Sequence, residues 1–419
     1  MKNHLHLPNA SPMNTGSVTA IAKPGLGGWL PLLVLLVLAS ITPTPVVAQE
    51  ASDPEAVGGL ADPYVVVDRW EVGEERIISD APSLLRLPDG ALLLAYQKIR
   101  DPQPGNMRVF RSEDDGETWQ QMPERVEFGA GRLFLHEEKP YFLGVGPDLR
   151  GDIRISRSED GGRTWAEPVT LFADHEAFYN PSTSMLKSDG KLYWTFGAPN
   201  TEGDRNTTGS RLVVVAGDLS AGLMDPGNWR ISNHLTFPDP DSIAGLDPSD
   251  GSYRAHHWLE GNVVKIGDGI RVIARCRIAQ HRTIHMAAVC AVKDDGRELE
   301  LRFNQFHPVP GAQNQFHMFR DEESGYYWMI SNLPTHPRDE RRILGLSYAL
   351  HPLCWFQAGI LVNGPTRDYA FNYTTPLIDG EDLLFVSRSS DQHFHDNNMI
   401  TFHRLKNFRS LAADLEPGE

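Results

Sequence analysis

Two copies of one short motif constrain the fold of this chain more than any other feature. Both fit the pattern S-x-D-x-G-x-T-W, and they start 46 residues apart. The serine and aspartate side chains of such a motif can bind turn backbone, the glycine allows a positive φ, and the tryptophan packs beneath. A turn that recurs at this interval indicates an array of similar supersecondary units. The motif residues are Ser112, Asp114, Gly116 and Trp119 in the first copy and Ser158, Asp160, Gly162 and Trp165 in the second.

The rest of the chain has the pattern of short strands separated by turns. Runs rich in branched and aromatic residues alternate with Asp-Gly turns, and helical periodicity does not persist through any long window. An all-β fold follows, either a sandwich pair or a propeller, and the repeat favours the propeller. The strand-like runs are Tyr64–Asp68, Ala91–Tyr96, Lys191–Phe196, Gly209–Ala216, Ile270–Cys276 and Leu383–Ser387.

The first 48 residues have the pattern of a secretory signal peptide. The apolar run Trp29–Ile41 has 13 residues, fewer than the roughly 20 that a membrane span needs. Lysines precede the run, and the small residues Val46–Ala48 follow it as a cleavage site. We therefore expect a leader over residues 1–48, a folded domain over residues 49–419, and a secreted or periplasmic protein. An uncleaved membrane anchor is the alternative.

Charge and cysteine content narrow the possible functions and cross-links. With 39 basic and 55 acidic residues the formal charge is −16, which argues against a nucleic-acid partner. A small acidic sugar remains possible, because a few converging arginines act locally. The three cysteines allow one disulfide at most. Cys276 and Cys290 lie in successive strand-like runs, where they either pair across a hairpin or remain free buried thiols.

The repeated motif resembles the Asp-box, or BNR repeat, of the sialidase (neuraminidase) superfamily. That resemblance implies a six-bladed β-propeller with the Asp-boxes at its outer rim. Weaker echoes of the motif occur at Asp225–Trp229 and Ser347–Trp355. The resemblance also implies that the last strand, Met399–Arg404, pairs with the segment Tyr64–Val67 and closes the ring.

The same resemblance implies an active site. Sialidases use three arginines on the substrate carboxylate, a tyrosine nucleophile with a glutamate base, and an aspartate as acid and base. Glu260 and Arg275 resemble the glutamate and the second arginine on adjacent inner strands. Arg341 resembles the third arginine, Tyr373 the nucleophile, and Asp101 the acid. Each also has a simpler structural explanation, such as an ion pair, a solvated arginine run, a packed aromatic ring or an Asp-Pro turn.

One position departs from the sialidase pattern. Where the first arginine is expected in an R-I-P motif, this chain has Asp80-Ala81-Pro82. A carboxylate at that point would repel the carboxylate of sialic acid. The fold is therefore expected, whereas specificity for sialic acid is doubtful.

Histidines suggest a second chemistry. We expect His257, His317 and His395 to face the central cavity and contact substrate. His257 with Tyr373 and Arg275 would suit a polysaccharide lyase, in which arginine holds a uronate and histidine or tyrosine moves the proton. Hydrogen-bonded strand histidines are the simpler explanation.

We expect no catalytic metal and no organic cofactor. The sequence His257–Glu260 lacks the H-E-x-x-H spacing of a zinc protease, and no dinucleotide or phosphate-binding fingerprint occurs in the expected mature chain. One acidic loop is a weak candidate for a structural calcium site, although it lacks EF-hand spacing. Its acidic residues are Asp239, Asp241, Asp247 and Asp250.

Three functions remain from the sequence. The first is a glycoside hydrolase of the sialidase type acting on an acidic or unusual sugar. The second is a polysaccharide lyase on the same propeller, and the third is a propeller that binds glycan or protein without catalysis. In each case we expect a monomer with a glycan or polysaccharide partner, no nucleic acid, and no membrane span after the leader is cleaved.

Overall fold

The computed structural model describes residues 58–73, 77–80, 82–100, 107–123, 126–147, 151–173, 178–179, 182–198, 211–238, 257–277, 285–335, 341–393, 395 and 397–413. The chain divides into two units, Met1–Thr44 and Pro45–Glu419. Every described residue belongs to the second unit, and the expected leader lies outside the described residues.

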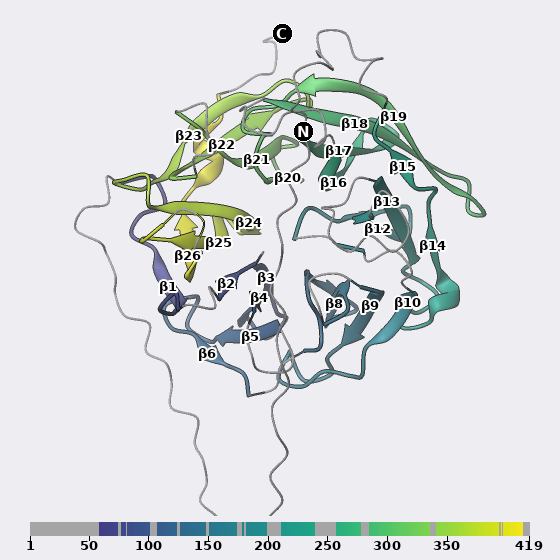
Figure 1. The fold of residues 1–419 in the computed structure, drawn as a ribbon, viewed down its shortest axis with the longest axis horizontal. Coiled ribbons are helices and arrows are strands. Elements are labelled where there is room, and N and C mark those ends of the chain that lie inside the picture. The colour runs from purple at the N-terminus through teal and green to yellow at the C-terminus, as the bar shows by residue number, and fades with distance from the viewer. Residues whose placement is uncertain are drawn as a thin grey trace, which may run out of the picture. The chain divides into compact units, whose positions relative to one another are not determined.

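Six antiparallel sheets follow one another along the chain and form the blades of a β-propeller (Figure 1). The first blade contains β2 (Ile78–Ser79), β3 (Ser83–Arg86), β4 (Leu92–Ile99), β5 (Met107–Ser112) and β6 (Gln120–Gln121). The second contains β7 (Gly131–His136), β8 (Lys139–Val145), β9 (Ile153–Arg157) and β10 (Val169–Phe172). The third contains β11 (Leu186–Ser188), β12 (Lys191–Ala198), β13 (Arg211–Asp218), β14 (Trp229–Ile231) and β15 (Leu235–Thr236).

The second half of the propeller is built in the same way. The fourth blade contains β16 (His257–Ile266), β17 (Gly269–Arg277), β18 (Met286–Asp294) and β19 (Leu299–Pro308). The fifth contains β20 (Phe316–Arg320), β21 (Tyr327–Asn332), β22 (Ile343–Ala349) and β23 (Phe356–Asn363). The sixth contains β24 (Ala370–Asp379), β25 (Asp382–Ser390), β26 (Met399–Leu405) and β1 (Val65–Arg69). Among the described residues the helices are two short 3-10 turns, η1 (Pro226–Asn228) and η4 (Phe408–Leu411).

The two ends of the described chain close the ring. β1 pairs with β26 in antiparallel register, with Val65 opposite Phe402 and Val66 opposite Thr401. In Figure 1 the purple β1 accordingly lies beside the yellow β26. The predicted pairing of Tyr64–Val67 with the last strand is confirmed. Because strands from both ends of the described chain share one sheet, β26 has a hydrogen-bonded partner on its outer side.

The repeated motif forms the turn between the third and fourth strands of a blade. In the first copy the hydroxyl of Ser112 donates to Oδ1 of Asp114 at 2.8 Å and accepts from the backbone N of Gly116 at 2.8 Å. The second copy has both bonds at the same distances, through Ser158 and Asp160. The first turn joins β5 to β6 and the second joins β9 to β10. The repeat is therefore a repeat of structure as well as of sequence.

The two weaker echoes occupy the same place in their own blades. Asp225 accepts from the backbone N of Gly227 at 2.9 Å and caps η1, between β13 and β14. Trp229 follows and is buried, with its indole N–H donating to the carbonyl of Leu223 at 2.8 Å. The second echo ends at Trp355, between β22 and β23. In four of the six blades a tryptophan thus lies at or within a few residues before the start of β6, β10, β14 or β23: Trp119, Trp165, Trp229 and Trp355.

The hydrophobic core consists of six clusters of buried side chains, one at each junction between neighbouring blades. Leu93 of the first blade, for example, shares a cluster with Phe142 of the second, and Val67 and Phe402 of the sixth share one with Trp119 of the first. The other four clusters join the second blade to the third, the third to the fourth, the fourth to the fifth and the fifth to the sixth. Burial of both sheet faces explains why the strands read as nearly continuous apolar runs.

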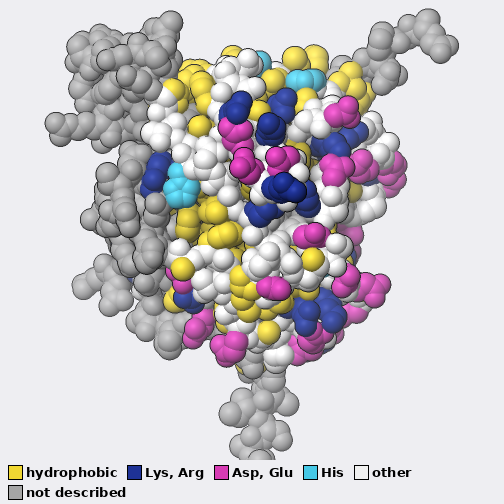
Figure 2. Space-filling model, turned by 90° about the vertical axis from the view of Figure 1, so that its right-hand side faces the viewer, with side chains coloured by type: hydrophobic (Ala, Val, Ile, Leu, Met, Phe, Trp, Pro, Cys, Tyr) yellow, Lys and Arg dark blue, Asp and Glu magenta, His cyan; other side chains and the backbone are white. Residues whose placement is uncertain are grey.

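The outer edges of the blades carry charges of both signs. Figure 2 shows basic and acidic side chains interspersed on the face it presents, among apolar and polar groups. Some of these charges join neighbouring blades. The carboxylate of Asp294 on β18 accepts from Arg230 on β14 at 2.5 and 2.8 Å and from Lys191 on β12 at 3.1 Å. Within the described part of the chain, no helix is long and apolar enough to cross a membrane.

All three cysteines are described, and all three are free thiols. Cys290 on β18 lies opposite Val272, whereas Cys276 is four residues further along β17, so the two cysteines are not cross-strand partners. Both are buried in one apolar cluster. Of the two alternatives left open by the sequence, the structure has the free thiols.

Candidate active site

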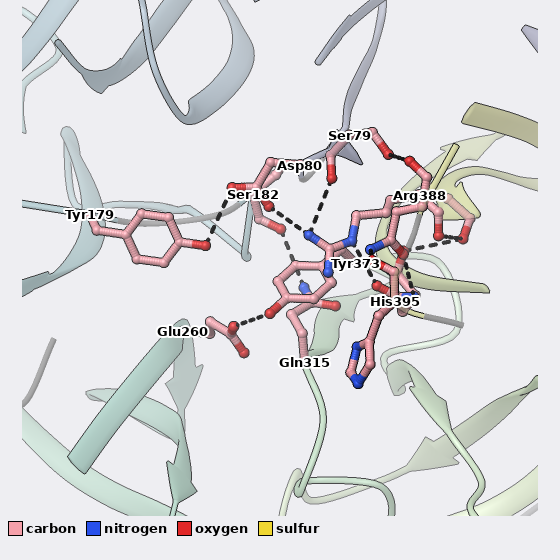
Figure 3. Close-up of polar contacts among 12 residues, drawn as sticks. Ser79, Asp80, Tyr179, Ser182, Glu260, Gln315, Tyr373, Arg388 and His395 are labelled. Carbon is pink, nitrogen blue, oxygen red and sulfur yellow. Dashed lines mark hydrogen bonds and ion pairs between the residues drawn. The ribbon is translucent and has the colours of Figure 1, made fainter. Parts of the chain in front are cut away.

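The first strands of the blades lie innermost and bring residues from distant parts of the chain together. β3 contacts β7 and β24, and β16 contacts β11 and β20. Polar residues on and beside these strands form a cluster that includes Asp80, Tyr179, Glu260, Tyr373 and Arg388 (Figure 3). The cluster contains two of the three residues that the sequence predicts to be catalytic.

Glu260 and Tyr373 both lie at irregular points in their strands. The pairing of β16 with β17 skips Glu260, and the pairing of β24 with β25 skips Tyr373 and Thr374. The φ angles of Glu260 and Tyr373 are +43° and +52°. Residues other than glycine rarely adopt this region, at a cost of about 1–3 kcal/mol each. Bulges of this kind redirect side chains and are common beside active sites. The backbone conformation therefore supports Glu260 and Tyr373 as candidate functional residues.

The two side chains meet although their residues are 113 positions apart. The phenol of Tyr373 donates to Oε1 of Glu260 at 2.7 Å. The guanidinium of Arg275 donates to Oε2 of Glu260 at 2.9 Å and to Oε1 at 3.1 Å, and it lies 3.4 Å from the phenol oxygen. Its Nε donates to the backbone carbonyl of Gln313 at 2.9 Å. Arg275 thereby fixes both carboxylate oxygens of Glu260.

The surroundings of Tyr373 keep its phenol protonated at neutral pH. Burial raises the pKa of Tyr373, and the negative charge of Glu260 raises it further. The cations of Arg275, Arg388 and Arg341 act in the opposite direction, and the resulting pKa is about 12. The phenol therefore needs a proton acceptor before it can act as a nucleophile, and Glu260 is in hydrogen-bond contact with it.

Arg341 is buried beside this pair. It lies between the fifth and sixth blades, where its backbone carbonyl accepts from the amide of Phe371 at 2.8 Å. The residue is only 8% exposed, which differs from the solvated run of arginines considered as the alternative. Its positive charge has the smallest effect of the three that lower the pKa of Tyr373.

Asp80, at the position where the sequence departs from the sialidase pattern, is buried in an ion pair with Arg388. NH1 of Arg388 donates to Oδ1 of Asp80 at 3.0 Å, and Nε donates to Oδ1 of Asn372 at 3.0 Å. The guanidinium carbon lies 4.1 Å from the centre of the Tyr373 ring. The acidic residue in place of the expected arginine is therefore accompanied by an arginine from another strand.

Tyr179 brings a second phenol to the same region. Its hydroxyl donates to Oδ2 of Asp80 at 3.4 Å, and Figure 3 shows it and Glu260 pointing toward the middle of the cluster. Burial raises the pKa of Tyr179 well above its usual value, and the nearby groups Asp80, Tyr373 and Glu260 raise it further. Two protonated phenols and two carboxylates thus converge.

His317 lies beneath the cluster and not at its surface. Its Nδ1 is 2.9 Å from the carbonyl of Thr374, the residue after Tyr373, and its Nε2 is 2.8 Å from NH1 of Arg132. Burial and the Arg132 cation lower the pKa of His317 well below its usual value. A neutral ring that donates from Nδ1 and accepts at Nε2 satisfies both contacts. His317 therefore supports the backbone next to Tyr373.

Of the remaining predicted residues, His395 lies at the edge of the cluster (Figure 3), where its carbonyl accepts from the side-chain amide of Asn397 at 3.1 Å. His395 is exposed, and its backbone N donates to Nδ1 of His393 at 3.3 Å. The backbone of His257 begins β16 opposite Arg277, but the description does not extend to its side chain. Asp101 and the acidic loop considered for calcium lie outside the described residues. Within the described part of the chain no group of three or more His, Cys, Asp or Glu side chains is placed to hold a metal ion.

Sequence reasoning missed Arg388, Tyr179 and Asn372. Arg388 is 308 residues from Asp80 along the chain, so no local pattern connects them. One signal was present, because Arg388 continues the apolar strand-like run Leu383–Ser387, and an arginine in a buried strand requires a partner.

A pocket of about 300 Å³ lies elsewhere on the propeller, at the ends of β18 and β19. His285, Pro308, Val309, Pro310 and Trp355 line it. None of these residues belongs to the cluster around Tyr373. The candidate site is thus identified by its buried charges and backbone irregularities and not by cavity size.

No protein-family model matches the sequence, and no curated protein matches it. Solved structures do resemble the fold. An α-L-arabinanase from Penicillium chrysogenum complexed with arabinobiose has a TM-score of 0.53 at 15% identity, over 85% of this chain and 100% of that chain. The Hadza microbial sialidase Hz136 has a TM-score of 0.53 at 16% identity, over 82% of this chain and 68% of that chain.

A third similar structure is the Trypanosoma rangeli sialidase in complex with sialic acid. Its TM-score is 0.52 at 14% identity, over 80% of this chain and 55% of that chain. Identities this low establish shared architecture and leave the substrate to be argued from the site. This chain has the six-bladed β-propeller fold that is shared by sialidases and α-L-arabinanases.

Proposed function

We propose that this protein is a retaining glycoside hydrolase in which Tyr373 is the nucleophile and Glu260 is its base. The observation that carries the proposal is the 2.7 Å contact from the phenol of Tyr373 to Oε1 of Glu260. Both residues lie at bulges with positive φ, a strained backbone conformation that the surrounding structure must stabilise. The pair has the distance and chemistry of an activated nucleophile.

The first chemical step would form a bond from the Tyr373 oxygen to the anomeric carbon of the sugar. As that bond forms, the phenol proton moves to Oε1 of Glu260, and the bond from the anomeric carbon to the leaving oxygen breaks. A carboxylic acid protonates the leaving oxygen. We propose Asp101 for this role on the sequence evidence. In the second step the Asp101 carboxylate takes a proton from water, the water oxygen bonds to the anomeric carbon, and the bond from that carbon to the Tyr373 oxygen breaks as Glu260 returns its proton to the phenolate.

Arg275 would position the base. It donates to both oxygens of Glu260, which holds the carboxylate with Oε1 toward the phenol. A carboxylate held by two further hydrogen bonds loses little rotational freedom during the reaction. This makes Arg275 a positioning residue for Glu260, and its place in a clamp for an acidic sugar, together with Arg341, stays a prediction.

The site gives evidence for and against sialic acid as the sugar that is cleaved. A neutral phenol nucleophile suits the anomeric carbon of sialic acid, because an attacking carboxylate would be repelled by the substrate carboxylate. Asp80 argues against that substrate, since it stands where the sialidase pattern has an arginine for the substrate carboxylate, and it engages Arg388 in an ion pair. The similar solved structures include a sialidase in complex with sialic acid and an arabinanase in complex with arabinobiose. We also propose that the enzyme is exported, because residues 1–48 have the pattern of a leader.

The test is a panel of nitrophenyl glycosides, both neutral and acidic, incubated with the purified protein. Release of nitrophenol identifies a hydrolase, and proton NMR of the fresh product gives the configuration at the anomeric carbon. Retention is expected from a covalent tyrosine intermediate. In parallel, the protein is incubated with uronate polysaccharides and the ultraviolet absorbance of the solution is followed. An unsaturated product would identify the lyase considered as the alternative.

Two variants connect the activity to the pair. Tyr373→Phe and Glu260→Gln should each abolish most of the turnover while the protein stays folded. Tyr348→Phe is the matched control, because Tyr348 is also buried and its hydroxyl accepts a hydrogen bond from the backbone N of Ala413 at 3.1 Å. Inversion of configuration, or full activity of Tyr373→Phe, would contradict the proposal.

A further inference from the structure

The ion pair of Asp80 and Arg388 occupies the wall of the site next to the nucleophile. Asp80 is 2% exposed, and Arg388 is 8% exposed. The guanidinium of Arg388 lies over the ring of Tyr373 at 4.1 Å, so the pair is fixed against that ring. Burying two charges is unfavourable unless they are well partnered, and it therefore calls for an explanation.

The contacts of Arg388 leave it poorly suited to hold a substrate carboxylate. Nε is occupied by Asn372 at 3.0 Å, and NH1 by Asp80 at 3.0 Å and by the carbonyl of Ser79 at 3.4 Å. A two-pronged grip on a carboxylate needs two parallel N–H groups on one edge of the guanidinium. Its NH2 group donates to none of the described residues, which leaves one group that can donate to a neutral acceptor.

The carbon that Tyr373 attacks would lie between two carboxylates. Glu260 contacts the phenol oxygen directly, and Asp80 lies behind Arg388 and contacts the hydroxyl of Tyr179. Figure 3 shows Tyr179, Glu260 and Tyr373 converging on one region. Arg275 and Arg388 are each engaged by one of these two carboxylates, which weakens their pull on a carboxylate at the attacked carbon. Hydroxyl groups, in contrast, can donate to carboxylates and accept from phenols and guanidinium groups.

We infer that Asp80, Arg388 and Tyr179 form a subsite that binds hydroxyl groups of an aldose residue. This inference rests on the proposed function and names its substrate class: a sugar whose anomeric carbon carries a hydrogen and not a carboxylate. NH2 of Arg388 and the phenol of Tyr179 contact the hydroxyl groups, and Asp80 is a positioning residue that binds both of these side chains. The site consequently rejects sialic acid at the position where sialidases would hold its carboxylate.

The experiment measures binding separately from turnover. The Tyr373→Phe variant keeps the ring on which Arg388 lies and lacks the nucleophile, so its ligands are not consumed. Isothermal titration calorimetry with this variant compares nitrophenyl glycosides of L-arabinose, D-galactose and D-glucuronic acid with that of N-acetylneuraminic acid. At least one aldose glycoside should bind, and the N-acetylneuraminic acid glycoside should bind at least about tenfold more weakly.

Two substitutions in the Tyr373→Phe background locate the subsite. Asp80→Asn keeps the shape and removes the charge, and it should weaken aldose binding about tenfold. Tyr179→Phe removes one hydroxyl group and should weaken it severalfold, which keeps the test valid if Asp80→Asn fails to fold. The matched control is Asp321→Asn, because Asp321 is another buried aspartate paired with an arginine, Arg409 at 2.7 Å, and lies outside the site. It should leave sugar binding unchanged.

Each outcome decides between the two proposals. Aldose binding that weakens in Asp80→Asn and Tyr179→Phe supports the subsite, even if the unsubstituted protein cleaves no glycoside, which would count against the hydrolase alone. Cleavage and tight binding of the N-acetylneuraminic acid glycoside would overturn the subsite and leave the hydrolase intact. Absence of binding to every aldose glycoside, or aldose binding unchanged in both variants, would also overturn the subsite.

Discussion

The phenol of Tyr373 donates a hydrogen bond to Glu260 at 2.7 Å, and both residues adopt positive φ at bulges in strands of different blades. Two independent irregularities thus serve one contact. If β16 and β24 were regular, their side chains would alternate between the two faces of each sheet. The bulges change the directions of the Glu260 and Tyr373 side chains from that alternation. The site is therefore encoded in the backbone as well as in the side chains.

Replacing Glu260 should make the Tyr373 phenol easier to ionise and should nevertheless lower the turnover. In Glu260→Gln the negative charge that raises the pKa of Tyr373 is removed, so that pKa should fall below its present value of about 12. Turnover should nevertheless fall about 10²–10⁴-fold, because the amide cannot accept the phenol proton. Ultraviolet difference titration of Glu260→Gln against the double variant Glu260→Gln/Tyr373→Phe isolates this one phenol. An unchanged turnover in Glu260→Gln would remove Glu260 from the mechanism.

Acid should destabilise the fold partly through His403. Its ring is buried, stacks on Phe385 at 4.5 Å and contacts the hydroxyl of Thr401 at 2.8 Å. Burial lowers the pKa of His403 from 6.5 to about 3. Its contribution to stability is fully present above pH 6.5 and is lost as pH falls toward 3, because only the unfolded chain binds the proton there.

The loss through His403 should be about 1.4 kcal/mol per pH unit within that window. Urea unfolding at pH 7 and at pH 5 measures it, with His403→Phe as the comparison. Between these two values the unsubstituted protein should lose about 2 kcal/mol more of its free energy of unfolding than the variant. Other titrating groups are shared by the two proteins and cancel in this difference. Equal losses would show that the ring accepts a proton in the folded state.

The three thiols should differ in reactivity with a disulfide reagent. Cys354 is exposed, whereas Cys276 and Cys290 are buried. Burial raises the pKa of Cys290 to about 12 and that of Cys276 well above its usual value, and only the thiolate attacks. Titration with Ellman's reagent should detect one thiol in the native protein and three in denaturant. Detection of a single thiol in denaturant would indicate a disulfide.

The sequence was most informative where structure is local and repeated. The motif that begins at Ser112 and Ser158 predicted the blade turns, and the ends of the chain predicted the closing pair of β1 and β26. The strands are buried between neighbouring blades on both faces, and their residues are therefore mostly apolar. These short apolar runs predicted the all-β fold.

The sequence was least informative where the site depends on long-range placement. Asp80 could be read only as a missing arginine, because the compensating Arg388 lies on a strand of the last blade. The positive φ of Glu260 and Tyr373 has no signature in the residues themselves, since bulges arise from the register between strands. His317 was expected to contact substrate, and its inner-strand position gave no sign that it would contact Arg132 and Thr374.

A comparison of two glycines should show how tightly the turn of the first S-x-D-x-G-x-T-W motif is packed. Gly116 has φ of +95°, and an added Cβ would lie 2.2 Å from the ring of Phe402. Gly90 has a similar φ of +88°, but no atom lies within 4 Å of the added Cβ. Gly90→Ala should therefore report backbone strain alone, about 1 kcal/mol of the free energy of unfolding, and Gly116→Ala should lose about 2–4 kcal/mol. Urea unfolding of the two variants at the same pH measures the difference. If both lose the same amount, then the ring of Phe402 moves aside freely and the turn is not packed against the last blade.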